Sequence, residues 1–194
     1  MNRFRTLLLS LVVLAALSSA NAVEIADVTI ADSLKQSAAG PELILNGAGL
    51  RTLYMVKIYV AGLYLTEKKG NTADVIALKG PKRIQMSLIR GVSVEQLLDA
   101  LNEGLKANLS AAEQAEFAGQ IEQLNTTFST LKKTKKGDVV ALDFIPGAGT
   151  RVSVNGQSTS PPIAGDEFYG ALLKIWLGDK PVQDKLKAAL LGQS

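Results

Sequence analysis

The chain has 194 residues, with 21 Lys and Arg against 18 Asp and Glu, and it contains no Cys and no His. This length fits one domain, and 47% hydrophobic with 20% charged residues is typical of a folded globular chain rather than a disordered one. The missing residue types exclude disulfide scaffolds, thiol nucleophiles, Ser-His hydrolase sites and zinc sites built on Cys or His. We therefore expect no metal and no cofactor.

Residues 1–22 have the features of a secretory signal peptide. Arg3 and Arg5 precede a short apolar stretch at 7–17, and Ala20-Asn21-Ala22 forms a small-residue cleavage site. The stretch is shorter than the roughly 20 residues that span a bilayer, so we expect cleavage rather than an uncleaved anchor. The expected product is a periplasmic or secreted protein whose single domain covers residues 23–194. Without the leader the charges nearly balance, which argues against nucleic acid as a partner.

Strand patterns outnumber helix patterns in the rest of the chain. Dense β-branched and aromatic residues predict one long strand over 52–65, and Asn155-Gly156 predicts a two-residue hairpin turn. The expected strands cover, in chain order, residues 23–30, 42–45, 52–65, 83–90, 139–145, 150–154 and 157–160.

Helix signals appear in two places, in the middle of the chain and near its end. The first two helices each open with a capping box, in which Ser is followed three residues later by Gln96 or Glu113. The third is stopped by Gly178. The helices are expected to begin at Ser93, Ser110, Asp166 (as the N-cap) and Val182. The elements together predict an α+β fold with a mainly antiparallel sheet and helices on one face.

Two glycine clusters and one basic segment have simple interpretations. Gly47-Ala48-Gly49 and Gly147-Ala148-Gly149 lack the third glycine of a dinucleotide-binding loop and open no helix, so both are expected as turns. Residues 132–136 hold four Lys around one Thr. We expect a solvated turn there, with attraction to anionic lipid headgroups as the weaker alternative.

Arg51 is the most informative candidate for a binding site. In an uninterrupted strand, Arg51, Lys57 and Tyr59 share one face among apolar neighbours. A guanidinium in apolar surroundings needs an anion. The anion could be a protein carboxylate, with Glu42 and Asp143 as candidates, or a ligand carboxylate held bidentately by Arg51 and hydrogen-bonded by Tyr59. The pattern alone favours the protein carboxylate, or a strand end in water.

The rest of the candidate pocket is expected from apolar and aromatic residues. Tyr169 is expected either in the core or in the pocket lining. The apolar part of the lining is expected at Met55, Leu63, Met86 and Leu88.

Six short motifs spread over the chain resemble, taken together, the motifs of one known family. They are GAGLR at 47–51, KIYVAGLYL at 57–65, GPKR at 80–83, PGAGT at 146–150, VNG at 154–156 and LKIWLGDKP at 173–181. Over about residues 26–192 the sequence resembles the exported bacterial branch of the chalcone isomerase-like family. The resemblance implies an open-faced β-sandwich, a large antiparallel sheet covered by helices with a ligand cleft between.

The resemblance also bears on function. The family includes enzymes that close a chalcone into a flavanone and relatives that bind fatty acids, and Arg51 matches an Arg that both groups use. Tyr59 matches a Tyr of the fatty-acid binders. The Tyr and Asn of the enzymes fall near Val94 and at Leu101 or Asn102, and their late Ser or Thr falls near Tyr169.

The expected function is non-catalytic binding of a small lipophilic carboxylate such as a fatty acid. Arg51, Tyr59, Lys57 and Tyr169 are the expected binding residues. One alternative is an isomerase (an intramolecular lyase) acting on a chalcone-like phenolic enone, with Arg51 as its catalytic residue. A second alternative is an envelope protein-interaction module without a pocket ligand.

Overall fold

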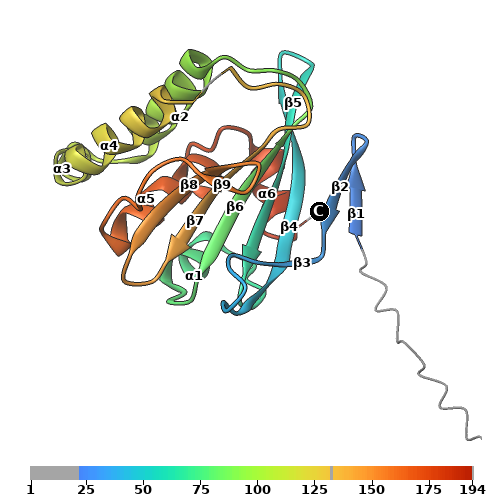
Figure 1. Ribbon diagram of the computed structural model, residues 1–194, viewed down its shortest axis with the longest axis horizontal. Helices are drawn as coiled ribbons and strands as arrows, with labels where there is room; N and C mark the ends of the chain where they lie inside the picture. The colour runs from blue at the N-terminus through green and yellow to red at the C-terminus, as the bar shows by residue number, and fades with distance from the viewer. Residues whose placement is uncertain (1–21, 132, 194) are drawn as a thin grey trace, which may run out of the picture.

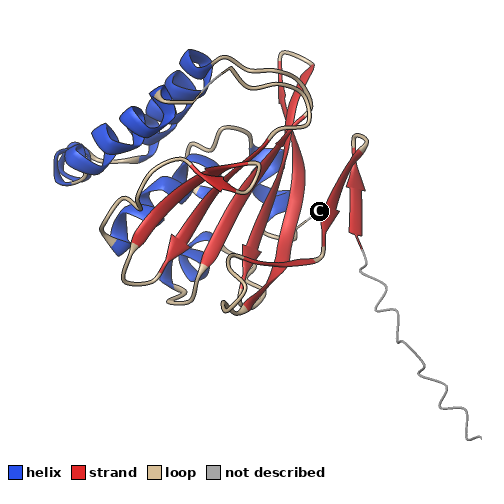
Figure 2. Cartoon of the chain, viewed as in Figure 1, coloured by secondary structure: helices blue, strands red, loops and turns tan. Residues whose placement is uncertain are grey.

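The computed structural model describes residues 22–131 and 133–193, and in this part of the chain seven strands form one antiparallel sheet (Figures 1 and 2). The strand order follows the chain order, so each strand pairs with its neighbours in the sequence. The strands are β3 (Ser33–Lys35), β4 (Glu42–Leu53), β5 (Val56–Leu65), β6 (Lys82–Leu88), β7 (Val139–Ile145), β8 (Gly149–Val154) and β9 (Gln157–Ser158). The predicted α+β fold with an antiparallel sheet is confirmed.

Helices cover one face of this sheet. They are α1 (Thr72–Ala77), α2 (Val94–Asn108), α3 (Ala111–Glu116), α4 (Ala118–Ser129), α5 (Asp166–Leu177) and α6 (Asp184–Leu190). Helices α5 and α6 pack on the strands, while α2 packs against α5 and α4 (Figure 1). Because α5 lies between the strands and α2, it is apolar nearly all round and forms the centre of the main core. No helix of the described residues combines the length and apolarity needed to cross a bilayer.

A hairpin of β1 (Ala22–Ile25) and β2 (Val28–Ala31) packs on the opposite face, where it helps to form a smaller apolar cluster. The prediction of one strand over 23–30 is therefore wrong. The turn residues Ala26 and Asp27 have φ of 50° and 63°, a conformation usually marked by Asn-Gly, so the sequence showed no turn signal. The predicted leader lies outside the described residues except for Ala22, which begins β1.

The strand predicted over 52–65 is also a hairpin. Tyr54 and Met55, with φ of 47° and 69°, form the two-residue turn between β4 and β5. Strand β4 is longer than predicted because Gly47 and Gly49, expected as a turn, lie inside it. A Cβ on Gly47 would lie 2.0 Å from the carbonyl oxygen of Ala189, so the glycine allows the end of α6 to approach the strand.

Both predicted capping boxes are present. The Ser93 and Ser110 side chains each accept a hydrogen bond from a backbone N–H of the first helical turn. The Gln96 and Glu113 side chains accept in turn from the backbone N–H of Ser93 and Ser110. The second predicted helix breaks at Phe117 into α3 and α4. The N-cap prediction for Asp166 is wrong, because Gly165 is the N-cap and the Asp166 carboxylate accepts the N–H of Gly147 instead.

Candidate functional site

Arg51 and Tyr59 lie directly opposite each other on β4 and β5. Their side chains share a face, as predicted, although the reason is cross-strand pairing and not alternation along a single strand. A β-bulge follows at once, since Thr52 pairs with Lys57 and leaves Ile58 as the extra residue. Because of the bulge, the Lys57 side chain lies on the opposite face of the sheet from Arg51 and Tyr59.

This face opens on a cavity of about 490 Å³, within the range of about 300–1,000 Å³ typical of small-molecule sites. Its walls come from the β4–β5 hairpin, the loop at 90–92, helix α2 and the segment before α6. The apolar part is lined by Leu53, Tyr54, Val56, Ile58, Val92, Leu97, Ala100 and Val182. The lining predicted at Met55, Leu63, Met86 and Leu88 is wrong, because Met55 is exposed at the turn and the other three lie in the main core.

Tyr59 supplies a buried hydrogen-bond donor to this pocket. Only 9% of the residue is exposed, and its hydroxyl accepts a hydrogen bond of 3.0 Å from Nε1 of Trp176. Burial raises the pKa of the Tyr59 hydroxyl, while the Trp176 hydrogen bond and the Arg51 charge partly offset this. The phenol therefore keeps its proton at neutral pH. Among the described residues no acceptor takes that proton, so the hydroxyl keeps one donor without a partner.

The carboxylates expected as partners of Arg51 bind other groups. Asp143 is fully buried and is held by Arg83 at 2.6 Å and by Arg151 at 2.8 Å. Glu42 accepts a hydrogen bond from a serine of β3. The interpretation that one of these carboxylates neutralises Arg51 is therefore wrong.

Arg51 lines the pocket, and most of its guanidinium donors have no partner among the described residues. One Nη donates to the carbonyl oxygen of Thr52, and in the part of the chain that the structure describes no carboxylate lies within the 4.0 Å ion-pair distance. Arg90 lines the same pocket, and Asp99 and Glu103 line it from α2. Arg51 and Tyr59 thus form one wall that can bind a carboxylate.

Lys57 and Tyr169 lie away from this wall. Lys57 is exposed, and neither residue lines the pocket. Tyr169 is fully buried on α5, where its hydroxyl accepts the N–H of Ile84 at 3.1 Å and donates to the carbonyl oxygen of Leu142 at 2.9 Å. The Tyr169 hydroxyl therefore ties α5 to the neighbouring strands β6 and β7. Nothing in this geometry adds to the prediction that either residue binds a ligand.

Residues 22–192 match the family described as chalcone isomerase-like. The chain belongs to the chalcone isomerase-like family. A search of curated proteins gives no match. Among solved structures, an Arabidopsis thaliana fatty-acid binding protein is similar, with a TM-score of 0.59 and 14% sequence identity over 82% of this chain and 96% of that one. This similarity confirms the predicted fold.

The resemblance aligns further polar residues of the chalcone isomerases with three positions of this chain. None of these positions contributes a polar group to the Arg51 pocket. Val94 is the first residue of α2, and Leu101 is buried in the core. The Asn102 amide donates to Asn125 at 3.1 Å and so joins α2 to α4. Neither Val94, Leu101 nor Asn102 lines the Arg51 pocket.

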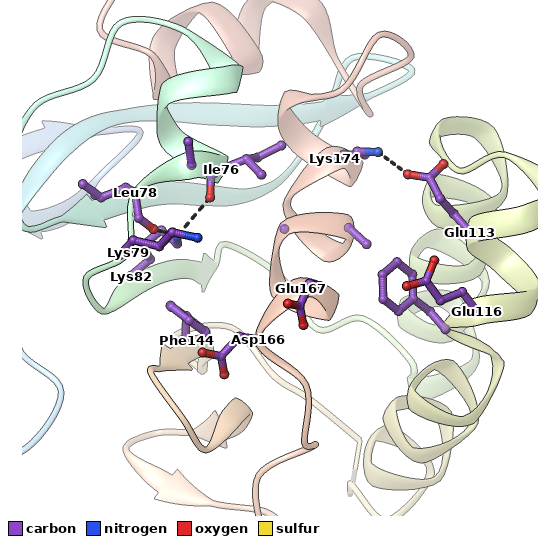
Figure 3. Close-up of a pocket in the computed structure, with 14 residues that line it drawn as sticks. Ile76, Leu78, Lys79, Lys82, Glu113, Glu116, Phe144, Asp166, Glu167 and Lys174 are labelled. Atoms are coloured by element: carbon purple, nitrogen blue, oxygen red, sulfur yellow. Dashed lines mark hydrogen bonds and ion pairs between the residues drawn. The ribbon is translucent and has the colours of Figure 1, made fainter.

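A second cavity of about 520 Å³ lies between α1, α3 and α5 in this chalcone isomerase-like chain (Figure 3). Lys174 and Glu113 form an ion pair of 2.7 Å at its edge, and the buried Lys82 ammonium donates to the carbonyl oxygens of Ile76 and Leu78. Four carboxylates line this cavity, at Glu113, Glu116, Asp166 and Glu167. They make it a poorer site for an anion than the Arg51 pocket.

Proposed function

We propose that this chalcone isomerase-like protein binds a small lipophilic carboxylate, such as a fatty acid, without converting it. The observation that carries the proposal is the arrangement of Arg51 and Tyr59. Within the residues that the structure describes, a guanidinium without a carboxylate partner lies beside a phenol whose proton has no acceptor, and both residues line an otherwise largely apolar pocket. The similar plant structure is described as a fatty-acid binding protein, which is consistent with this ligand class.

Each part of the pocket would bind a different part of the ligand. Arg51 would hold the carboxylate, and Tyr59 would donate a third hydrogen bond to it. The tail would lie against the apolar side chains of the hairpin and of α2. Burial of the tail supplies most of the affinity, at about 25 cal/mol per Å² of apolar surface, while Arg51 sets the orientation.

We also propose that binding takes place outside the cytoplasm, in the periplasm or after secretion. This part rests on the leader features of residues 1–22. N-terminal sequencing of the protein recovered from the periplasm tests it, with a start at Val23 as the expected result.

The binding proposal is tested by titrating a naturally fluorescent conjugated fatty acid into the protein and its Arg51→Ala variant. We expect affinity for the acid to fall by about tenfold to a hundredfold in Arg51→Ala, because a charge-assisted hydrogen bond contributes about 1.5–3 kcal/mol. The melting temperature should change little, because the Arg51 side chain forms no ion pair within the described residues.

Two controls make the test specific. Lys57→Ala removes a nearby positive charge outside the pocket and should leave affinity unchanged. The methyl ester of the same acid should bind the wild type and Arg51→Ala equally, because it carries no charge for Arg51 to recognise. Equal affinity of the wild type for acid and ester would contradict the proposal. Turnover of a chalcone above the spontaneous rate, lost in Arg51→Ala, would instead support the isomerase alternative.

A further inference from the structure

The turn between β4 and β5 exposes four consecutive apolar residues. We call residues 53–56 the β4–β5 tip. Leu53 and Val56 are 48% and 40% exposed, and Tyr54 and Met55 at the turn itself are 92% and 97% exposed. Single exposed apolar residues are common, but a contiguous set on a projecting turn is typical of a surface that meets another apolar phase.

Fold stability does not explain the residues at this turn. Tyr54 and Met55 both have positive φ, where Asn and Gly are favoured and bulky side chains are strained. Strained backbone of this kind clusters at functional sites. The tip therefore combines a conformational cost with the exposure of two large apolar groups.

Exposed basic residues lie on the segments that neighbour the tip. Lys57 directly follows it, and Arg90 is exposed on the loop that lines the same pocket. The exposed Lys133, Lys135 and Lys136 belong to a segment that is joined to this loop, because the Thr134 hydroxyl donates to the carbonyl oxygen of Val92 at 2.6 Å. Figure 1 shows this segment at the end of the molecule where the β4–β5 hairpin projects.

Two acidic residues also line the pocket. Asp99 and Glu103 belong to α2, whose axis leads away from the hairpin (Figure 1). The tip is thus an apolar projection with Lys and Arg side chains on neighbouring segments, and apolar insertion and charge attraction both favour binding to an anionic lipid surface.

We propose that the β4–β5 tip inserts into an anionic phospholipid surface. Tyr54 and Met55 enter the boundary between headgroups and acyl chains, where Tyr is a favoured residue, and the surrounding Lys and Arg side chains contact the headgroups. Leu53, Tyr54 and Val56 also line the Arg51 pocket, so docking places the pocket opening at the lipid. A carboxylate ligand would then pass between membrane and pocket with little exposure to water. This last step rests on the proposed function, while docking itself does not.

The test is flotation of the protein with phosphatidylcholine vesicles prepared with and without phosphatidylglycerol. We expect the wild type to float with the anionic vesicles at low salt and to lose much of this binding at high salt, since salt screens exposed charges. The variant Tyr54→Asn/Met55→Gly has residues that suit the turn and lacks both apolar groups. It should bind these vesicles at least about tenfold more weakly, because each buried apolar side chain contributes more than about 1.4 kcal/mol.

A matched control exists in the other hairpin. Ala26→Asn introduces a turn-favouring residue at a turn of the same conformation and keeps the Asp27 charge, so it should leave vesicle binding intact. Carboxylate binding is measured separately in solution without vesicles, so a failure of the carboxylate proposal would appear there and not in the flotation assay.

Three results would overturn the docking proposal. One is absence of wild-type binding to anionic vesicles, and another is equal binding by the tip variant. The third is a concentration-dependent dimer of the wild type that the tip variant cannot form without lipid, which would show that a second copy of the chain covers the tip.

Discussion

Arg51 and Tyr59 share a face because they are directly paired just before a β-bulge. The bulge changes which side chains share a face, so Lys57, only two residues from Tyr59, points away from the pocket. The Trp176 indole holds the Tyr59 hydroxyl in place from α5. A single hydrogen bond thus links the sheet to the central helix at the point where the ligand is proposed to bind.

Lys82 is a second residue in an unusual environment. It is buried, its ammonium lies 4.8 Å above the Phe144 ring, and it donates to carbonyl oxygens at the end of α1. Burial lowers the pKa of Lys82 from 10.5 to about 8, and the neighbouring Lys79 charge adds to this effect.

The shift predicts how stability depends on pH. Between the folded pKa of about 8 and the unfolded value of 10.5, the unfolded chain binds more protons at Lys82 than the folded chain does. The free energy of unfolding therefore rises with pH in this window. Lys82→Met removes the effect, so the difference between wild type and variant should grow in favour of the wild type from pH 7 to about pH 9.5.

Urea unfolding of both proteins at several pH values measures this difference. The tyrosines whose pKa is raised, such as Tyr64 at about 12, oppose the effect above pH 10, but they are present in both proteins and cancel. A difference that stays constant, or that shrinks as pH rises, would contradict the prediction.

At the scale of elements, two hairpins have turns without the Asn-Gly or Asp-Gly pair that favours them, and the β4–β5 hairpin gives a test of what this costs in stability. Tyr54 and Met55 hold positive φ without the side chains that favour it. We expect Tyr54→Asn/Met55→Gly to raise the free energy of unfolding by about 1–2 kcal/mol, because left-handed backbone costs a bulky residue about that much.

Thermal melting and urea unfolding check this, with an expected rise in melting temperature of about 2–4 °C per kcal/mol for a chain of this size. A loss of stability would show that the tip packs against the rest of the protein. The gain in stability together with the loss of vesicle binding would identify the tip as a segment whose residues serve function at the expense of stability.

At the scale of the whole molecule, one ion-pair network joins strands β6, β7 and β8 to the segment that follows β3. Asp143 of β7 binds Arg83 of β6 and Arg151 of β8, and Gln36 donates to Asp143 from the segment after β3. The network lies on the side of the sheet away from the main core. It holds the N-terminal part of the chain against the sheet.

Asp143→Ala should lower the free energy of unfolding by about 3–5 kcal/mol, because it leaves two half-buried guanidiniums without a partner. Urea unfolding measures the loss. A triple variant, Arg83→Met/Asp143→Leu/Arg151→Met, replaces the network with apolar groups of similar size and should recover most of the stability. A loss below about 1 kcal/mol in Asp143→Ala would show that the network contributes little.

The sequence by itself determined the features that depend on neighbouring residues. Both capping boxes, the strands β7 and β8 and the helix stopped by Gly178 follow from local spacing, and the structure confirms them. The sequence also predicted that Arg51 and Tyr59 share a face, which the structure confirms, while their role in ligand binding stays a prediction.

The tertiary structure alone decided the hairpins at 26–27 and 54–55, the path of β4 and the walls of the pocket. Neither hairpin has the Asn-Gly or Asp-Gly pair that marks a two-residue turn in the sequence, and β4 contains glycines that only the approach of α6 explains. Asp143 is no partner for Arg51 because it binds Arg83 and Arg151 on the opposite face of the sheet. Local patterns cannot encode these features, because each depends on which distant segments pack together, and that is settled by burial and charge pairing across the whole fold.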